Sequence, residues 1–258
     1  MNGMTARFFL LLLAALLGSC SHARKFAKAR PSESTPFLRH AAEMRASDPG
    51  RSPFARVWRN PSPKVWQNAR ERWTIHIAPV CLDHLRPVGR ALARVESGDE
   101  ARERAAARLA AYLREEFARA FRESPGPRQE VVAAPAADSL LVELALVELD
   151  PNPVSGGVTR RFINLLTFPG AESVVGDPLK GRTAIEGRLY DPVQKQVLLE
   201  FTDVEQNRSA LILSLHDYNH YSHARKVARE WARQFEALVR MPPSARVKDS
   251  PAFMIWLW

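Results

Sequence analysis

Two alternating segments near residue 200 most constrain the fold of this chain. In Thr183–Tyr190 and Gln196–Asp203, apolar and polar side chains alternate with the two-residue period of a half-buried strand. Only the short connection Asp191–Lys195, which contains a proline, separates them. A connection of this length joins antiparallel neighbours. The two segments are therefore predicted to pair as a hairpin.

Two further strands and two helices complete the predicted domain. Residues 73–80 alternate like a strand, and residues 139–149 are apolar on both faces apart from two glutamates, as in a central strand. A capping-box sequence at 97–100 begins a helix whose apolar stripe reaches Phe121, and a second amphipathic helix covers about 222–239. The predicted fold class is α+β. It is a two-layer sandwich, with a roughly four-stranded mixed sheet and two main helices on one face in the order β-α-β-β-β-α.

The hairpin and the helix after it resemble a known family. TAIEGRLYDPVQKQVLLEFTDVE (183–205) and HDYNHYSHARKVAREWARQF (216–235) are similar to the bacterial lipoprotein family called domain of unknown function 3313. Members commonly have Thr-Gly in the turn, where this chain has Gln194 and Lys195. The resemblance spans about 73–240 and implies an envelope lipoprotein, with no established activity and no catalytic residues. The matching residues are Asp191, Asp203, Tyr221, His223 and Trp231.

The N-terminus predicts export from the cytoplasm. Phe8–Leu17 is an apolar run of ten residues preceded by Arg7. As a helix it would be about 15 Å long, half of the ~30 Å hydrocarbon core, so it cannot span a bilayer alone. A basic residue, a short apolar run and small residues in this order are typical of a secretory signal peptide. Residues 1–19 are therefore predicted to be a signal peptide.

The end of that signal resembles the bacterial lipobox. In lipobox proteins the cysteine thiol is joined to a diacylglycerol, the chain is cut before it, and the new amine is acylated, often with palmitate. Three acyl chains would anchor the protein permanently. Ser21, in place of the aspartate that favours inner-membrane retention, implies the outer membrane with the domain facing the periplasm. An ordinary signal peptide with a chance cysteine is the alternative. The lipobox-like residues are Leu17, Gly18, Ser19 and the lipidation candidate Cys20.

Basic residues are concentrated next to the predicted lipid. Residues 21–72 hold 12 Lys and Arg against four Asp and Glu, whereas residues 73–258 hold 24 of each sign. The segment 20–72 is also rich in Pro and Ser, so it is predicted to be a disordered tether. Its charge either attracts anionic headgroups or belongs to a merely solvated linker. No nucleic-acid partner is predicted, because the folded part is neutral and has no groove-reading motif.

A histidine cluster is the candidate metal site. His216, His220 and His223 have a spacing that could bind zinc, with Asp217 as a further ligand or as a hydrogen-bond partner of one. A loop before the helix would break that spacing, so a structural role for His223 near the helix start is the favoured interpretation. No metal and no cofactor are predicted.

A second cluster of reactive residues lies at 81–84. Cys81, Asp83 and His84 offer a nucleophile, an acid and a base within four positions. Catalytic partners usually meet through the fold and not as chain neighbours. The chain is therefore predicted not to be an enzyme. Lipidation of Cys20 would leave Cys81 as the only thiol, so no intramolecular disulfide is expected.

Two apolar segments are candidates for protein contacts. Residues 154–176 are long for a connection inside one domain and too apolar for disorder. Packing on the uncovered face of the sheet is the favoured interpretation, and contact with a membrane or with a partner is the alternative. The other segment is the apolar tail, 241–258, which follows the predicted domain 73–240. The candidate contact residues are Phe162, Leu165, Phe168, Trp256 and Trp258.

These observations predict a lipid-anchored, periplasm-facing cell-envelope protein. It would be a non-catalytic interaction or scaffold module that binds another envelope component. Two alternatives remain open. One is an envelope hydrolase or metal-binding protein that uses the histidine cluster, and the other is a ring-forming secretion component whose segment 154–176 enters the membrane.

Overall fold

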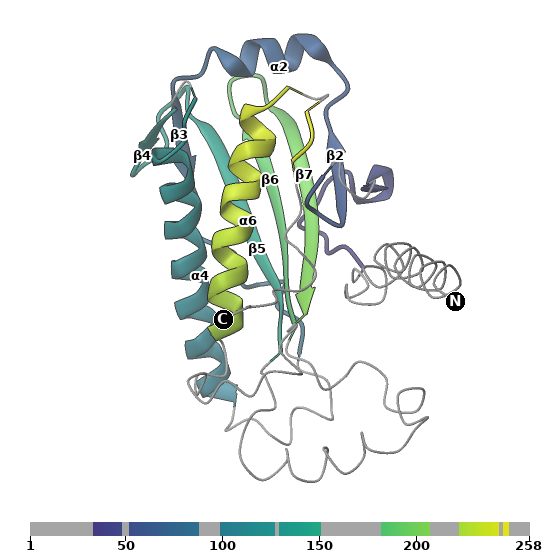
Figure 1. Ribbon diagram of the computed structural model, residues 1–258, viewed down its shortest axis with the longest axis vertical. Helices are drawn as coiled ribbons and strands as arrows, with labels where there is room; N and C mark the ends of the chain where they lie inside the picture. Colours follow the sequence, from purple (N-terminus) through teal and green to yellow (C-terminus); the bar gives the residue numbers. More distant parts are fainter. Residues whose placement is uncertain are drawn as a thin grey trace, which may run out of the picture.

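Seven strands form one mixed sheet, in the order β1-β2-β7-β6-β5-β3-β4, and two long helices cover one of its faces (Figure 1). The computed structural model describes residues 33–47, 52–87, 99–126, 129–150, 182–206, 222–242 and 245–247. Within them the strands are β1 (Arg45–Ala46), β2 (Arg56–Arg59), β3 (Thr74–Ile77), β4 (Glu130–Val132), β5 (Leu140–Leu149), β6 (Arg182–Asp191) and β7 (Gln196–Gln206). The helices are α2 (Pro63–Arg70), α4 (Asp99–Arg122) and α6 (Ser222–Arg240), with a short 3-10 helix, η1 (Ala41–Glu43).

The predicted hairpin is confirmed and lies near the centre of the sheet. Strands β6 and β7 pair antiparallel along their whole length, from Arg182 opposite Gln206 to Asp191 opposite Gln196. Strand β5 pairs antiparallel with the other side of β6, and β3 continues the sheet parallel to β5. In the turn, Lys195 has φ of 54°, in the left-handed region that favours glycine. The turn therefore needs a left-handed residue although this chain has no glycine there.

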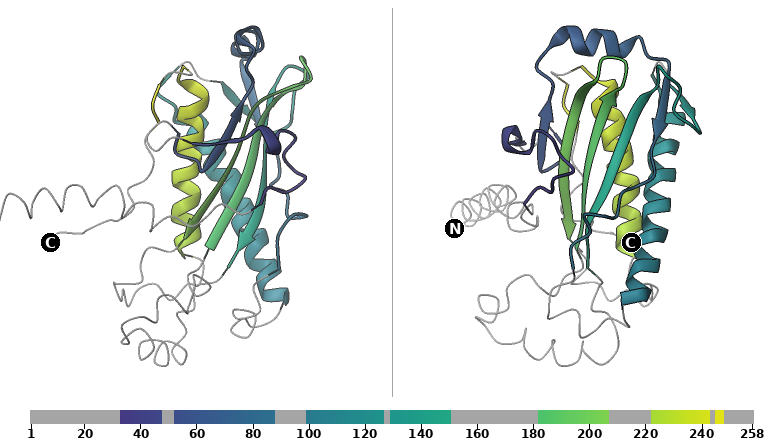
Figure 2. Two further views of the ribbon diagram at one scale, coloured as in Figure 1. Left: turned by 90° about the vertical axis from the view of Figure 1, so that its right-hand side faces the viewer. Right: turned by 180° about the vertical axis from the view of Figure 1, so that it is seen from behind.

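The main core lies between the sheet and helices α4 and α6 (Figure 2). Phe117 of α4, Phe201 of β7 and Phe235 of α6 are fully buried, and the Phe235 ring lies 5.5 Å from Phe117 and 5.1 Å from Phe201. Gly187 of β6 makes room for this packing, because a Cβ there would lie 2.2 Å from Cε1 of Phe201. The amphipathic stripes of both helices thus determine which face of the sheet is covered.

The predicted four-stranded sheet with two helices is wrong. The sheet has seven strands, and a third helix, α2, crosses its upper end beside the β6–β7 turn (Figure 1). The side-chain amide of Gln194 joins that turn to α2 by donating to the carbonyl oxygen of Val65 at 3.0 Å. The missed strands β1, β2 and β4 contain only two to four residues. Segments this short carry no readable alternation and form because a neighbouring strand pairs with them.

The predicted disordered tether over 20–72 is also wrong for residues 33–47 and 52–72, which belong to the folded domain. Strand β2 pairs with β7, and the buried ring of Phe54 stacks on Phe201 with 4.1 Å between centroids. A few apolar residues are enough to order this segment, because the edge of β7 supplies backbone hydrogen bonds to β2. The basic excess divides accordingly: residues 21–32 hold four basic and no acidic residues, and residues 33–72 hold eight basic and four acidic residues.

Candidate functional site

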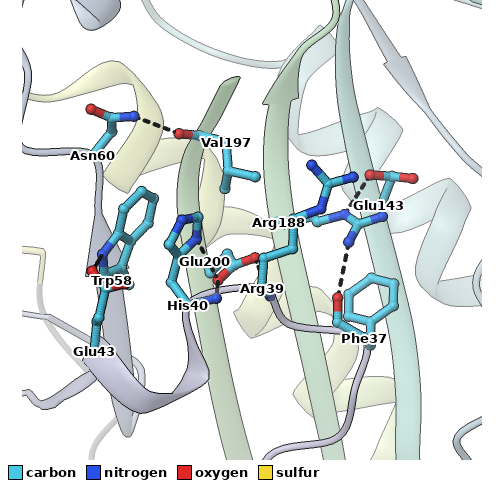
Figure 3. A network of polar contacts seen from close by, with 10 residues as sticks. All are labelled: Phe37, Arg39, His40, Glu43, Trp58, Asn60, Glu143, Arg188, Val197 and Glu200. Atoms are coloured by element: carbon cyan, nitrogen blue, oxygen red, sulfur yellow. Dashed lines mark hydrogen bonds and ion pairs between the residues drawn. The ribbon is translucent and has the colours of Figure 1, made fainter. Parts of the chain in front are cut away.

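The face of the sheet opposite helices α4 and α6, called the outer face below, is crossed by residues 33–44, called the strap. Alternation places Glu186, Arg188 and Glu200 on this face, because Ile185, Gly187, Leu199 and Phe201 point toward the helices. The described strand ladders include no residue of the strap. Figure 3 shows that the strap instead crosses the strands and meets side chains.

Two buried carboxylates hold the strap by its main chain. Glu186 and Glu200 are 1% and 0% exposed. Glu186 accepts hydrogen bonds from the amide of Thr35 at 2.8 Å and from its hydroxyl at 2.5 Å. Glu200 accepts the amides of Arg39 at 2.9 Å and His40 at 2.8 Å, one on each oxygen. Buried carboxylates need such donors, and charge-assisted bonds are the stronger kind.

Aromatic and charged side chains add to these contacts at the end of the strap near β2. The His40 ring stacks on Trp58 of β2 at 3.7 Å between centroids and 2° between planes, and its Nδ1 lies 3.2 Å from Glu200 (Figure 3). Trp58 donates its indole N–H to Glu43 at 3.0 Å. The strap is therefore fixed to β7 and to β2 at the same place.

Arg188 holds the middle of the strap. Its guanidinium donates to Glu143 of β5 at 2.5 Å and to the carbonyl oxygen of Phe37 at 2.9 Å (Figure 3). It also lies 4.8 Å from the centroid of the Phe37 ring. The hydrogen bond to Glu143 raises the pKa of Arg188 further above its ordinary value. Arg188 thus joins two strands to the strap as a permanent cation.

Burial also raises the pKa of Glu186. The hydroxyl and amide of Thr35, and the nearby charges of Arg86 and His84, oppose that shift. Both buried carboxylates are already engaged by donors of the strap, so neither of them is free to act as a general base. The described part of the outer face thus holds the protein's own N-terminal segment.

Two of the family-pattern residues meet at a second contact, between α6 and the sheet. Asp203 accepts the indole N–H of Trp231 at 2.7 Å and the amide of Ala55 at 2.9 Å. Asp203 and Trp231 are 2% and 1% exposed. This carboxylate therefore joins helix α6, strand β7 and the chain that leads into β2, which is a structural role.

Asp191, a third family-pattern residue, holds the β6–β7 turn. It accepts the amides of Val193 at 2.9 Å and Gln194 at 3.0 Å, and lies 3.3 Å from Nε of Arg72. Burial by itself would raise the pKa of Asp191, but the hydrogen bonds from Gln194 and the charge of Arg72 hold it below its ordinary value. These hydrogen bonds from Val193 and Gln194 to Asp191 stabilise a turn that has no glycine.

Most of the sequence-predicted site residues lie outside the described residues. His223 is the second residue of α6, and its side chain is also outside the described part. In the described ranges, no group of three or more His, Cys, Asp or Glu side chains could hold a metal ion. Residues outside the description are Leu17, Gly18, Ser19, Cys20, Phe162, Leu165, Phe168, His216, Asp217, His220, Tyr221, Trp256 and Trp258.

The 81–84 cluster is described. Cys81 has a half-buried free thiol, and its backbone forms an isolated parallel β-bridge with Ala145 of β5. The His84 ring lies edge-on to Phe37 of the strap at 6.1 Å. His84 thus packs against the strap. None of the helices that the structure describes is both long and apolar enough to cross a membrane.

Sequence reasoning missed the strap. Its contacts join residues about 150 positions apart, for example Thr35 to Glu186 and Arg39 to Glu200. The available signal was the pair Glu186 and Glu200 in two central strands, where a side chain becomes buried once another segment covers that face of the sheet. Such positions rarely hold a charge without a partner.

A comparison with family models decides the family. The model of the family described as "Protein of unknown function (DUF3313)" matches residues 34–235. The chain belongs to the DUF3313 family. The DUF3313 match begins within the strap, so the strap is part of the family's domain and not an appended tail. No curated protein matches this chain.

Solved structures similar to this DUF3313 chain include two from bacteria. One is the PelC dodecamer from Paraburkholderia phytofirmans, with 10% identity, 72% of this chain and 97% of that chain covered, and a TM-score of 0.37. The other is protein XCC0632 from Xanthomonas campestris, of the family DUF330. It has 12% identity, 73% and 93% coverage, and a TM-score of 0.36.

Proposed function

We propose that this DUF3313 protein is a lipid-anchored cell-envelope protein that faces the periplasm from the outer membrane. It acts as a non-catalytic interaction or scaffold module for another envelope component. The observation that carries the proposal is the strap: the chain that leads from Cys20 into the domain is held on the outer face by two buried carboxylates. The described part of the folded domain therefore begins thirteen residues after the candidate lipidation site, Cys20.

The length of the chain between lipid and strap supports this arrangement. Thirteen peptide steps separate Cys20 from Glu33, and they span at most about 45 Å. Residues 21–32 hold four basic and no acidic residues. Each basic residue near an anionic surface contributes about 1 kcal/mol of attraction. The lipid and this basic segment would together keep the domain at the membrane, where it meets its partner.

Acylation of Cys20 is the first test. The wild-type chain is expected to incorporate labelled palmitate, to have the intact mass of a triacylated product that begins at Cys20, and to sediment with the outer membrane. Cys20→Ser should lose the label, and Cys81→Ser, the matched control at the other cysteine, should keep it. An unacylated wild-type chain in the soluble cytosolic fraction would end the proposal.

Cross-linking in intact cells tests the interaction role. A discrete band between this protein and one envelope component is expected for wild type, and it should weaken for Cys20→Ser. A ladder of multiples of this chain would instead support the ring-forming alternative. Bound zinc that disappears when His216, His220 and His223 are replaced by Ala would contradict the non-catalytic assignment and favour the metal-dependent alternative.

A further inference from the structure

The strap is joined to the domain mainly through side chains of the outer face. Its main-chain amides donate to Glu186 and Glu200, and its Phe37 carbonyl oxygen accepts from Arg188. The main core cluster, on the other face, includes no strap residue among its described members, although Leu38 of the strap is itself buried, with 5% exposed. Phe37 packs against the small cluster formed by Ala145, Val147, Ala184 and Val204, and its ring also contacts Arg188 and His84.

Such a segment can leave the domain without opening the sheet. The strand that follows it, β1, pairs with β2 and keeps the remaining chain in place. When the strap leaves, Glu186 and Glu200 come into contact with water, which replaces the lost peptide donors. The net cost is therefore smaller than that of leaving a carboxylate buried without a donor. Release is a local opening of the kind that has less free energy than global unfolding.

We infer that the strap is a releasable clamp that sets how far the domain can stand from its anchor. This inference rests on the proposed attachment at Cys20. With the strap docked, thirteen peptide steps lead from Cys20 to Glu33, a reach of at most about 45 Å. With the strap released, 25 steps lead to Arg45, the first residue of β1, a reach of at most about 85 Å.

Release has a second consequence on the outer face. The docked strap covers Glu186, Glu200 and the ring of Trp58. When the strap leaves, these groups are exposed to solvent, and at the same time the maximum distance between Cys20 and the domain increases. Tension on the lipid anchor would favour this released state. The strap lies between the anchor and the rest of the domain in the chain, so a force applied at Cys20 acts first on the contacts of the strap.

Single-molecule force spectroscopy on the mature chain 20–258 tests the clamp. The handles are the thiol of Cys20 and a cysteine at Val193, which is 51% exposed in the β6–β7 turn, and Cys81→Ser removes the third thiol. A reversible step that adds up to about 40 Å of contour is expected before global unfolding, because twelve steps separate Glu33 from Arg45. Unlipidated protein suffices, so failure of the clamp is distinct from failure of acylation in cells.

Variants test whether the extension step is the loss of the strap's hydrogen bonds to Glu186 and Glu200. Glu200→Gln should release the strap at least tenfold faster at a given force. Glu115→Gln, on the exposed surface of α4, should not change the rate. Thr35→Val, which removes one donor to Glu186 without touching the sheet, should also accelerate release and serves if Glu200→Gln does not fold. Absence of a step before global unfolding, or equal release rates in all variants, would overturn the clamp.

Discussion

Replacement of Asp203 by Asn should destabilise the domain markedly. The two oxygens of Asp203 accept from different donors, the buried indole N–H of Trp231 and the partly buried amide of Ala55. Asn has the same size but only one acceptor oxygen, so one of these donors loses its partner. A hydrogen bond to a charged group contributes about 1.5–3 kcal/mol, and a stranded buried donor costs a comparable amount.

The expected loss in the free energy of unfolding is therefore about 2–3 kcal/mol. Domains of ordinary stability unfold with about 5–15 kcal/mol, so this is a large fraction of the total. For a folded part of this size, each kcal/mol corresponds to a Tm shift of about 2–4 °C, which predicts a decrease of roughly 4–12 °C.

Urea unfolding followed by far-UV circular dichroism measures this effect without relying on tryptophan fluorescence. A cycle with Trp231→Phe isolates the pair, and a coupling of about 1.5–3 kcal/mol is expected between the two positions. Asp138→Asn, at an exposed position before β5, is the matched control and should change stability by less than about 0.5 kcal/mol. A coupling near zero, or equal effects at positions 203 and 138, would refute the reasoning.

Three further changes test other parts of the fold. Lys195→Gly should raise the free energy of unfolding by about 0.5–1 kcal/mol, because glycine adopts the left-handed φ of 54° without strain; calorimetry that finds a lower Tm would contradict this. Gly187→Ala should cost at least about 1–3 kcal/mol, because its Cβ would overlap the ring of Phe201; urea unfolding measures the loss, and an unchanged midpoint would show that the ring can move. Glu186→Gln should flatten the dependence of stability on pH. Burial raises the folded-state pKa of Glu186 above its ordinary 4.5, so between these pKa values the folded chain binds more protons than the unfolded one and stability falls as pH rises. When the free energy of unfolding is measured across that pH window, the fall with rising pH should be smaller in Glu186→Gln than in wild type. An equal slope in both proteins would contradict the raised pKa of Glu186.

The long elements could be predicted from sequence because each carries its own pattern. The predicted helix over about 222–239 was found at Ser222–Arg240, and the strand over 139–149 at Leu140–Leu149. The helix carries a consistent apolar stripe that leaves little choice of buried face, and the strand is a continuous apolar run with turn residues after it. The start of α2 was also readable, since Pro63 follows Ser62 as at many helix starts. The Pro- and Ser-rich composition around it pointed to disorder instead.

The candidate site could not be predicted in this way. Nothing local in residues 33–44 indicates that Arg39 and His40 will meet Glu200, or that the strap will cross the strands instead of joining them. The glutamates looked like the exposed polar positions of a half-buried hairpin. Only the assembled sheet brings both side chains to its outer face, where the strap that crosses this face buries them and supplies their donors.

The sequence by itself determined the central hairpin and the two long helices, because their side-chain periods select a secondary structure without reference to the rest of the chain. It determined strand β5 through a short apolar run that ends at Asp150-Pro151. The tertiary structure alone decided the seven-stranded order, the short strands at both edges and the strap on the outer face. These features depend on contacts across up to 161 residues. Such contacts become favourable only after the sheet has brought both carboxylates to its outer face, where the N-terminal amides can reach them and exclude water.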